Sequence, residues 1–371
     1  LFPTVYKYIS ETGDMAFLDE VIPFADKEEG TVYEHLKRAV DFSMNHLGVH
    51  GMPAGLYADW NDCLRLGKAG ESSFVAMQFY YAMTILKKFA EYKGDTDYIA
   101  YLEEKQKQQG DVINEFCWNE DRFIRGFTEA VETIGKRTDN EANMWLNPQS
   151  WSVISGLATE EQTEKAMENV YEKLNTKFGA ILMDPPYHKE AFEGALAVIY
   201  NAGTKENAGI FSQSQGWLIL AEALLGHGDR AFTYFMENSP AAQNADAEIR
   251  VLEPYCYGQF TEGKASPQFG RSHVHWLTGT ASTVMVGCVE GILGMRPDFE
   301  GLRIAPSIPK EWEQFEIEKD FRGKHLHIVV KNRNHAQCGC IKMIVNGVET
   351  DGSYVTESML TDHTEIEYIM S

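Results

Sequence analysis

Hydrophobic positions in the first 295 residues recur mainly at helical spacing. Two clear stripes are Val32, Leu36 and Val40, and Phe74, Tyr81 and Ile85. Such residues share one face of an α-helix, so the stripes predict amphipathic helices. Segments 217–225 and 284–293 are apolar on nearly all sides, which predicts two buried helices. Loops rich in Gly, Pro, Asn and Trp lie between the helices at 49–70, 183–210 and 253–280, and loops of this kind usually carry function.

The hydrophobic period changes after Pro297. Leu326, Ile328 and Val330 occupy every second position, which is typical of a β-strand. Asn346-Gly347 follows another alternating run and predicts a tight hairpin, because both residues tolerate positive φ. The sequence therefore predicts a mainly α protein with a β domain. We place an all-α domain at residues 1–295 and a small antiparallel β domain at residues 296–371.

The composition narrows the classes of partner. The 371 residues include 55 Asp and Glu against 33 Lys and Arg, a formal charge of −22, whereas nucleic-acid binding requires clustered basic residues. No apolar stretch approaches the ~20 residues of a membrane span. The six cysteines are scattered without a CxxC pair, which predicts reduced thiols and a cytoplasmic protein. The chain begins at Leu1 without a signal-peptide pattern, so we expect a cut N-terminus.

The densest group of polar and aromatic residues lies at positions 55–63. Here Asp59 and Asp62 flank Trp60 and Asn61. A carboxyl beside an indole loses solvation, so its pKa rises and it can serve as a general acid near neutral pH. The alternative interpretation is structural: one Asp caps the following turn and Trp60 packs in the core.

The segment 50–72 reads HGMPAGLYADWNDCLRLGKAGES and resembles the signature of the cellobiose phosphorylase family, the inverting disaccharide phosphorylases of glycoside hydrolase family 94. Further blocks that resemble the family lie at 31–39, 205–211, 253–255, 276–281 and 291–297. The resemblance implies the latter part of an (α/α)6 catalytic toroid followed by a jelly-roll-like β domain. It also implies a C-terminal fragment that is inactive alone, from a protein that is a homodimer at full length.

The resemblance assigns the catalytic roles. It implies that Asp62 is the general acid and that phosphate attacks the anomeric carbon from the opposite face. Phosphate is already an anionic nucleophile, so no second carboxylate is needed as a base, unlike in an inverting hydrolase. The family pattern implies that Thr278 and Gly279 bind phosphate. Thr278 could also simply cap the apolar helix that follows, and a helix N-terminus itself favours anions.

One position departs from the family pattern. Gln213 stands where family members carry a phosphate-binding His. An amide can still donate a hydrogen bond, so we assign Gln213 to the phosphate site, although it adds no positive charge. Residues that could supply the missing donor or charge are Ser214, Arg271, His273 and His275.

Four further residues are assigned to the sugar. Tyr200 and Lys205 match positions that line the acceptor subsite in similar enzymes, and Trp60 and Asp59 are assigned to substrate binding. Lys205 could equally be a solvated loop lysine. We expect no cofactor beyond phosphate as co-substrate, and no metal, because His273-Val274-His275 has no convincing third ligand.

Two other functions remain open. One is an inverting hydrolase on the same toroid, with Asp59 or Glu253 as base, and the other is a non-catalytic carbohydrate-binding protein. The leading hypothesis is a phosphorylase for a cellobiose-like β-glucoside. Cellobiose, laminaribiose, chitobiose, cellobionic acid and β-1,2-glucan are not distinguished by the sequence.

Overall fold

The computed structural model describes residues 1–350 and 352–371 and divides into two compact units. Unit 1 comprises Leu1–His35, Ile219–Thr233 and Met285–Ser371, and unit 2 comprises Leu36–Leu218 and Tyr234–Val284. The chain is helix-rich with several small sheets, in agreement with the predicted mainly α protein with a β domain. The boundary at residue 295, the toroid and the jelly roll stay predictions. Among the described residues, no helix is long and apolar enough to span a membrane.

The predicted helices are present with small shifts in their ends. The stripe from Val32 lies in α2 (Val32–Met44), and the stripe from Phe74 lies in α3 (Ser73–Lys93). The two apolar segments correspond to α7 (Ser212–Leu224) and to α10 (Thr280–Val286) with the π-helical turn Gly287–Ile292. The remaining helices of eight or more residues among the described residues are α1 (Phe2–Thr12), α4 (Thr96–Cys117), α5 (Leu146–Ile154), α6 (Glu160–Lys173) and α8 (Gly228–Asn238).

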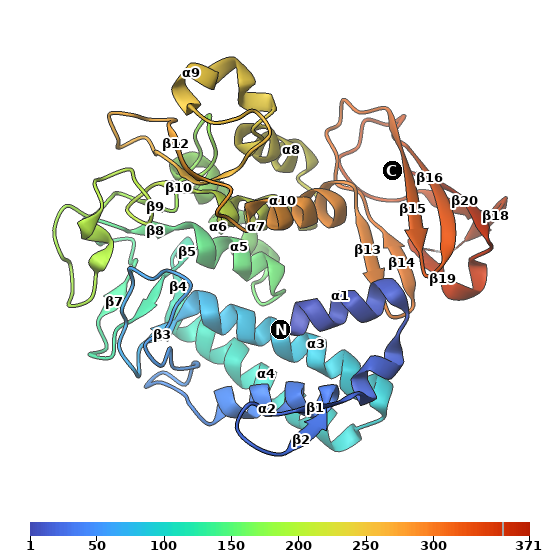
Figure 1. Cartoon of the computed structure of the whole chain (residues 1–371), viewed down its shortest axis with the longest axis horizontal. Helices are drawn as coiled ribbons and strands as arrows, with labels where there is room; N and C mark the ends of the chain where they lie inside the picture. Colours follow the sequence, from blue (N-terminus) through green and yellow to red (C-terminus); the bar gives the residue numbers. More distant parts are fainter. Residues whose placement is uncertain (351) are drawn as a thin grey trace. The chain divides into compact units, whose positions relative to one another are not determined.

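In unit 2, α3, α4, α5 and α6 form the helical framework (cyan to green in Figure 1). Local signals fix where these helices begin and end. The Ser72 side chain accepts a hydrogen bond from the Val75 amide at the start of α3, and Gly94 ends the helix with φ +68°. Asp95 then caps α4 through the Tyr98 amide. The helices enclose a core that includes Phe74, Met77, Ile113, Phe123 and Trp151.

Short strands, which the sequence did not predict, organise the loops of unit 2. Three sheets matter for the site: β3-β6-β7 (Glu71–Ser72, Gly126–Phe127, Thr133–Ile134), β10-β11-β12 (Ile210–Phe211, Gly258–Thr261, Ser272–His275) and the pair β8-β9 (Met144–Trp145, Met183–Asp184). These strands have two to four residues, too few for a period of two to be visible.

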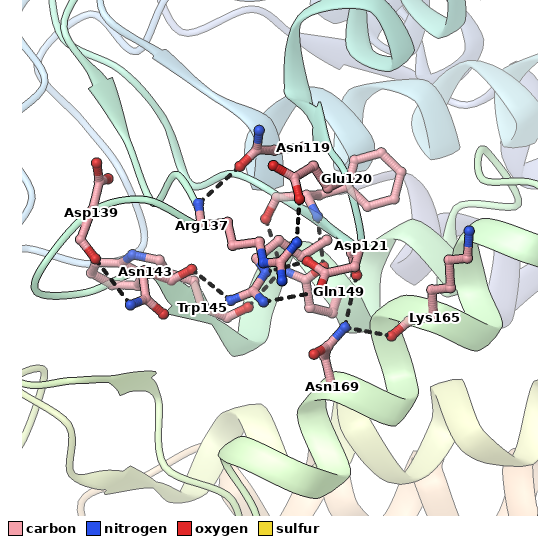
Figure 2. A network of polar contacts seen from close by, with 12 residues as sticks. Asn119, Glu120, Asp121, Arg137, Asp139, Asn143, Trp145, Gln149, Lys165 and Asn169 are labelled. Atoms are coloured by element: carbon pink, nitrogen blue, oxygen red, sulfur yellow. Dashed lines mark hydrogen bonds and ion pairs between the residues drawn. The ribbon is translucent and has the colours of Figure 1, made fainter.

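The hairpin β4-β5 (Trp118–Asn119, Arg122–Phe123) carries a dense polar network (Figure 2). The buried Arg122 donates to Asp121 Oδ1 at 2.7 Å and to the Asn143 carbonyl at 3.0 Å. Gln149 accepts from the Phe123 amide at 2.9 Å and donates to the carbonyls of Phe123 and Trp145. Asn169 donates to the Asp121 carbonyl at 3.1 Å. The network joins the hairpin to α5 and α6.

The β part of unit 1 contains a five-stranded sheet in the order β15-β16-β20-β17-β18 (orange to red in Figure 1). The strands are β15 (Gln314–Phe321), β16 (Lys324–Lys331), β17 (Lys342–Val345), β18 (Val348–Thr350) and β20 (His363–Ile369). The predicted alternation is confirmed, since Leu326, Ile328 and Val330 are fully buried. The hairpin at Asn346-Gly347 is also confirmed, with both residues at positive φ. β16 and β20 pair in parallel, however, so this sheet is not purely antiparallel.

A smaller sheet of unit 1 has the order β13-β14-β19. It comprises Met295–Asp298, Gly301–Ile304 and Tyr354–Thr356. The N-terminal segment of the same unit adds the pair β1-β2 (Val21–Pro23, Glu29–Thr31). All eight candidate site residues lie outside these elements, in unit 2.

Candidate active site

A buried carboxylate shapes the loop that precedes the Asp-Trp-Asn-Asp segment. Glu71 is 1% exposed and accepts hydrogen bonds from the backbone amides of His50, at 3.1 Å, and Met52, at 3.0 Å. The His50 ring also contacts the same carboxylate at 2.6 Å. Gly48 is required here, because a Cβ at that position would lie 2.3 Å from Glu71 Cγ. The glycines of this loop thus allow the chain to wrap around Glu71 at the start of α3.

Two side-chain to backbone hydrogen bonds form the turn that carries Asp62. Asp59 Oδ1 accepts from the Asn61 amide at 2.8 Å, and Asn61 Oδ1 accepts from the Cys63 amide at 3.0 Å. Asn61 and Cys63 are buried, whereas Asp62 between them is exposed. The turn therefore presents the Asp62 carboxyl to solvent. This geometry also agrees with the structural alternative, in which Asp59 caps the turn.

Trp60, two residues before Asp62, contacts aromatic residues. Its ring lies edge-on to Phe211 and Trp217, at centroid distances of 5.0 and 5.8 Å. Its Nε1 donates to Gln213 Oε1 at 3.1 Å. Because an indole N–H only donates, this bond fixes the amide orientation, and Gln213 Nε2 is left as a donor. A Cβ at Gly279 would lie 3.6 Å from this Nε2 atom. The structure thus brings Trp60, Gln213 and Gly279 together.

Thr278 lies at the start of α10. Its Oγ1 accepts from the Thr280 amide at 3.2 Å and also contacts the Thr280 hydroxyl. This turn directly before the helix agrees with the alternative in which Thr278 serves the helix start, and both roles of Thr278 stay predictions. Thr283 on the same helix donates to the Gln213 carbonyl at 3.0 Å, which ties the start of α10 to the start of α7.

The two residues predicted for the acceptor sugar, Tyr200 and Lys205, lie near Cys63, the residue that follows Asp62. Lys205 Nζ lies 5.1 Å from the centre of the Tyr200 ring. The pKa of the Cys63 thiol is raised to about 11, mainly by burial. The charges of Glu206 and Asp62 contribute to this rise, whereas a hydrogen bond with Tyr200 and the charge of Lys205 oppose it. These influences place Asp62, Cys63, Tyr200, Lys205 and Glu206 within one electrostatic cluster.

Glu206 is a member of this cluster that the sequence did not single out. Burial raises its pKa, Lys205 lowers it and Asp62 raises it again. Its Oε2 atom is buried and has no hydrogen-bond partner among residues 1–350 and 352–371. Asn207 holds the loop in place by donating to the carbonyls of Tyr187 and Tyr200, both at 2.9 Å. The one available signal for Glu206 was its place between Lys205 and Asn207 in a family-like block.

Asp59 is buried in an ion pair with Arg125, which the sequence also missed. Both side chains are 1% exposed. The residues considered as substitutes for a phosphate-binding His have other partners. His273 pairs with Glu262 at 2.7 Å, and His275 pairs with Glu253, the alternative base, at 3.1 Å. Similarly, Ser214 donates to the Phe211 carbonyl, and Arg271 donates to Gln268.

A metal site is not evident in the part of the chain that the structure describes. No three His, Cys, Asp or Glu residues are arranged there to hold an ion. The two residues of the His273-Val274-His275 motif each contact a different carboxylate. The expectation of a metal-free site stays a prediction.

A cavity of about 1210 Å³ lies beside the segment that follows Asp62. Cys63 accepts a hydrogen bond from the Leu196 amide at 2.9 Å, and the Arg65 amide donates to Gly194 at 3.1 Å. Leu196, Gly194 and Arg65 all line the cavity. The charged residues of its lining are Arg65, Glu129, Glu132, Glu190 and Glu193. The cavity is therefore predominantly acidic.

Solved structures support a common fold at low sequence identity. A sialidase superposes over 96% of this chain and 31% of its own, with a TM-score of 0.62 and 15% identity. A family 78 rhamnosidase from a Bacillus species superposes over 89% of this chain and 31% of its own, with a TM-score of 0.56 and 14% identity.

Curated relatives are more similar in sequence. N,N'-diacetylchitobiose phosphorylases from Vibrio furnissii and Vibrio proteolyticus are 36% and 35% identical, over 95% and 98% of this chain. The solabiose phosphorylase of Paenibacillus borealis is 30% identical over 94%. The chain spans 44%, 45% and 46% of the lengths of these three relatives. Residues 1–294 match the family model described as the glycosyl hydrolase 94 superfamily, catalytic domain, and the chain belongs to this family.

Proposed function

We propose that the natural protein containing this chain is an inverting disaccharide phosphorylase. A phosphate oxygen attacks the anomeric carbon of a β-linked disaccharide, and the bond from this carbon to the glycosidic oxygen breaks. Asp62 donates its proton to that oxygen, so the products are an α-sugar 1-phosphate and a free sugar. Such proton donation contributes about 10²–10⁴-fold to the rate. Phosphate is the nucleophile, and the reaction needs no other cofactor.

The observation that supports this function best is that one turn carries both an exposed acid and the Trp60 side chain that orients an amide donor. Asp62 is presented by its turn, and the adjacent Trp60 orients Gln213 so that Nε2 is available near Gly279. We assign Gln213, Thr278 and Gly279 to phosphate because an amide N–H, a hydroxyl and a backbone N–H can each donate a hydrogen bond to a phosphate oxygen. Trp60 and Asp59 stay assigned to substrate binding, without a choice between the two sugars.

The acceptor sugar is assigned to the cluster of Tyr200 and Lys205 and to the adjoining cavity. The four glutamates of the lining make a carboxylate-bearing acceptor unfavourable, so the released sugar is neutral. The curated relatives make N,N'-diacetylchitobiose a candidate disaccharide beside the cellobiose-like β-glucoside expected from the sequence.

The larger assembly is part of the same proposal. The packing of α3 against α4 and of α5 against α6 supports an (α/α)6 toroid. The five-stranded sheet supports a jelly-roll-like β domain. We propose a cytoplasmic homodimer for the natural protein.

The test is phosphate dependence. The natural protein is incubated with cellobiose, laminaribiose or N,N'-diacetylchitobiose, with and without phosphate, and the sugar 1-phosphate is measured. We expect turnover only with phosphate. Equal turnover without phosphate would instead favour an inverting hydrolase that uses Asp59 or Glu253 as base. Sugar binding without turnover would favour a non-catalytic carbohydrate-binding protein.

A further inference from the structure

We infer that Arg125 is a positioning residue that holds the general acid Asp62 in place through Asp59. This inference rests on the proposed function for the role of Asp62. Arg125 belongs to none of the segments to which the sequence assigned chemistry. It follows strand β5 and precedes β6, and its side chain is 1% exposed.

The guanidinium of Arg125 is held on several sides. It lies 5.7 Å from the centres of both the Phe74 and Trp145 rings, and its Nη1 donates to Ser72 Oγ at 2.6 Å. The backbone is fixed as well, because the Arg125 amide donates to the Ile134 carbonyl at 2.8 Å. A planar group that contacts two rings and a hydroxyl loses little further freedom when it binds a carboxylate. Arg125 is thus a rigid donor.

The second Nη atom of Arg125 connects this rigid group to the acid turn. Nη2 contacts Asp59 Oδ1, the same oxygen that accepts from the Asn61 amide. Asn61 Oδ1 in turn accepts from the Cys63 amide. The amides before and after Asp62 are therefore both held by one chain of contacts that begins at Arg125. A shift of the Asp59 carboxylate changes the direction in which Asp62 points.

The ion pair is poorly explained by stability alone. Asp59 Oδ2 is buried and finds no hydrogen-bond partner within the described part of the chain. A buried charge pair with an unpaired oxygen contributes little to stability, because desolvation offsets the attraction. A displacement of about 1 Å at a reacting group, by contrast, costs about 100-fold in rate. The geometry of the Arg125–Asp59 pair is therefore better explained by a role in positioning Asp62 than by a contribution to stability.

The variant Arg125→Lys tests the inference in the natural protein. Lysine keeps the charge, but its single ammonium cannot reproduce the fork that contacts Asp59 and Ser72 together. We expect kcat for the disaccharide to fall about 30-fold with KM nearly unchanged. Phosphorolysis of a 2,4-dinitrophenyl β-glycoside should fall less than about threefold, because this leaving group departs without a proton.

Arg122→Lys is the matched control. Arg122 is also 1% exposed and bound to a carboxylate, but its partners are Asp121 and the Asn143 carbonyl. This variant should change the two activities by the same factor. The inference is overturned if Arg125→Lys lowers both activities equally, or if Arg122→Lys shows the same selective loss.

Two further measurements test the inference if Arg125→Lys folds poorly or if the protein shows no activity. Asp59→Glu retains the charge and moves the carboxylate by one methylene group, and it should show the same selective loss. Amide hydrogen exchange at Asn61 and Cys63 should accelerate in Arg125→Lys but not in Arg122→Lys, whether or not the protein is active. Absence of phosphorolysis in the wild type refutes the proposed function, whereas unchanged exchange at these amides overturns the role of Arg125.

Discussion

Arg122 and Arg125 are three residues apart and equally buried, yet they belong to networks of different kinds. In the hairpin network (Figure 2), the three guanidinium nitrogens of Arg122 and both polar atoms of the Gln149 side-chain amide have protein partners. In the acid turn, Asp59 Oδ2 and Asn61 Nδ2 are buried without a partner among the described residues. A network that stabilises the fold closes its hydrogen bonds, whereas a network at a reaction site retains free polar atoms.

The largest effect on activity is expected in the turn at residues 59–63, where buried polar atoms lack a partner among the described residues. Asp62→Asn should lower kcat/KM for the disaccharide about 1000-fold, because the amide cannot donate the proton to the glycosidic oxygen. The Tm should stay within about 1 °C, since Asp62 is exposed and its substitution removes no buried contact. Initial rates of sugar 1-phosphate formation and a thermal melt provide both values.

Asp121→Asn is the control for Asp62→Asn in the closed network. Asp121 accepts two hydrogen bonds from Arg122. Their contribution to the free energy of unfolding should fall when the negative charge of Asp121 is removed. The expected result is reduced stability with full activity per folded molecule. Retained activity in Asp62→Asn would remove Asp62 from the role of acid.

The second largest effect is expected on the stability of the hairpin network around Arg122. Arg122→Met should lower the free energy of unfolding by about 3 kcal/mol, because it removes contacts to Asp121 and to the Asn143 carbonyl inside the protein. Arg137→Met removes the surface pair with Glu120, in which both side chains are more than half exposed, and should cost less than about 0.5 kcal/mol. Hydrogen exchange of the β4-β5 amides measures both. Equal effects would show that burial does not decide the strength of these pairs.

The sequence predicted local features well and long-range pairs poorly. Helices such as α3 follow from a repeated apolar face and from caps adjacent in sequence, at Ser72 and Gly94. The turn at residues 59–63 likewise depends on residues two apart. Arg125 and Asp59, by contrast, are 66 residues apart, and Trp60 and Gln213 are 153 apart. Neither pair leaves a periodic signal in one sequence, so neither contact was predicted.

The residues of the candidate site divide in the same way. A short motif predicted their chemical roles, but it did not predict which residues they contact in the folded protein. Glu206 was overlooked because its proximity to Asp62 arises only when the loop before α7 folds back on the acid turn. The parallel pairing of β16 with β20 was missed for the same reason, since 31 residues separate the end of one strand from the start of the other and alternation alone does not set strand direction.

Glu237 on α8 tests whether an unpaired buried oxygen always marks function. Its Oε2 has no partner in the described ranges, and Asn175 donates to Oε1 at 3.2 Å. Burial raises the pKa of Glu237 to about 7, and the bond from Asn175 partly opposes this. A folded-state pKa above the ordinary value of about 4.3 means that stability is lost as pH rises from about 4.3 to 7.

Glu237→Gln should therefore raise the free energy of unfolding by about 2 kcal/mol at pH 8 and change it little at pH 4. Urea unfolding at the two pH values measures the difference. Glu161→Gln on the exposed face of α6 is the control and should show no comparable gain. If Glu237→Gln instead lowers catalytic activity, unpaired buried oxygens mark function beyond the acid turn. Stabilisation with full activity would restrict that interpretation to atoms near Asp62.

The smallest effect is expected on the exposed face of the five-stranded sheet. His327 Nδ1 lies 2.7 Å from Glu365, and a hydrogen bond to this carboxylate, followed by the charges of Glu365, Glu318 and Glu316, raises the pKa of His327. A raised histidine pKa stabilises the fold below the ordinary value of about 6.5, and this contribution is lost as pH rises through the folded-state pKa. Glu365→Gln should lower the pKa of His327 in an NMR titration, and 1 M salt should reduce the difference.

His325 provides the internal reference for that titration. Its hydrogen bond to Asp320 is the main cause of its raised pKa, so Glu365→Gln should move the His327 titration and leave the His325 titration nearly unchanged. Equal changes in the pKa of both histidines would show that the carboxylates of this face act on them collectively. A selective shift would show that even exposed pairs here are local, because water screens each imidazole from all but its nearest carboxylate. Charged pairs on the solvated sheet would then act independently, whereas in the turn at residues 59–63 a buried pair, Arg125 and Asp59, acts on the exposed Asp62 through the backbone.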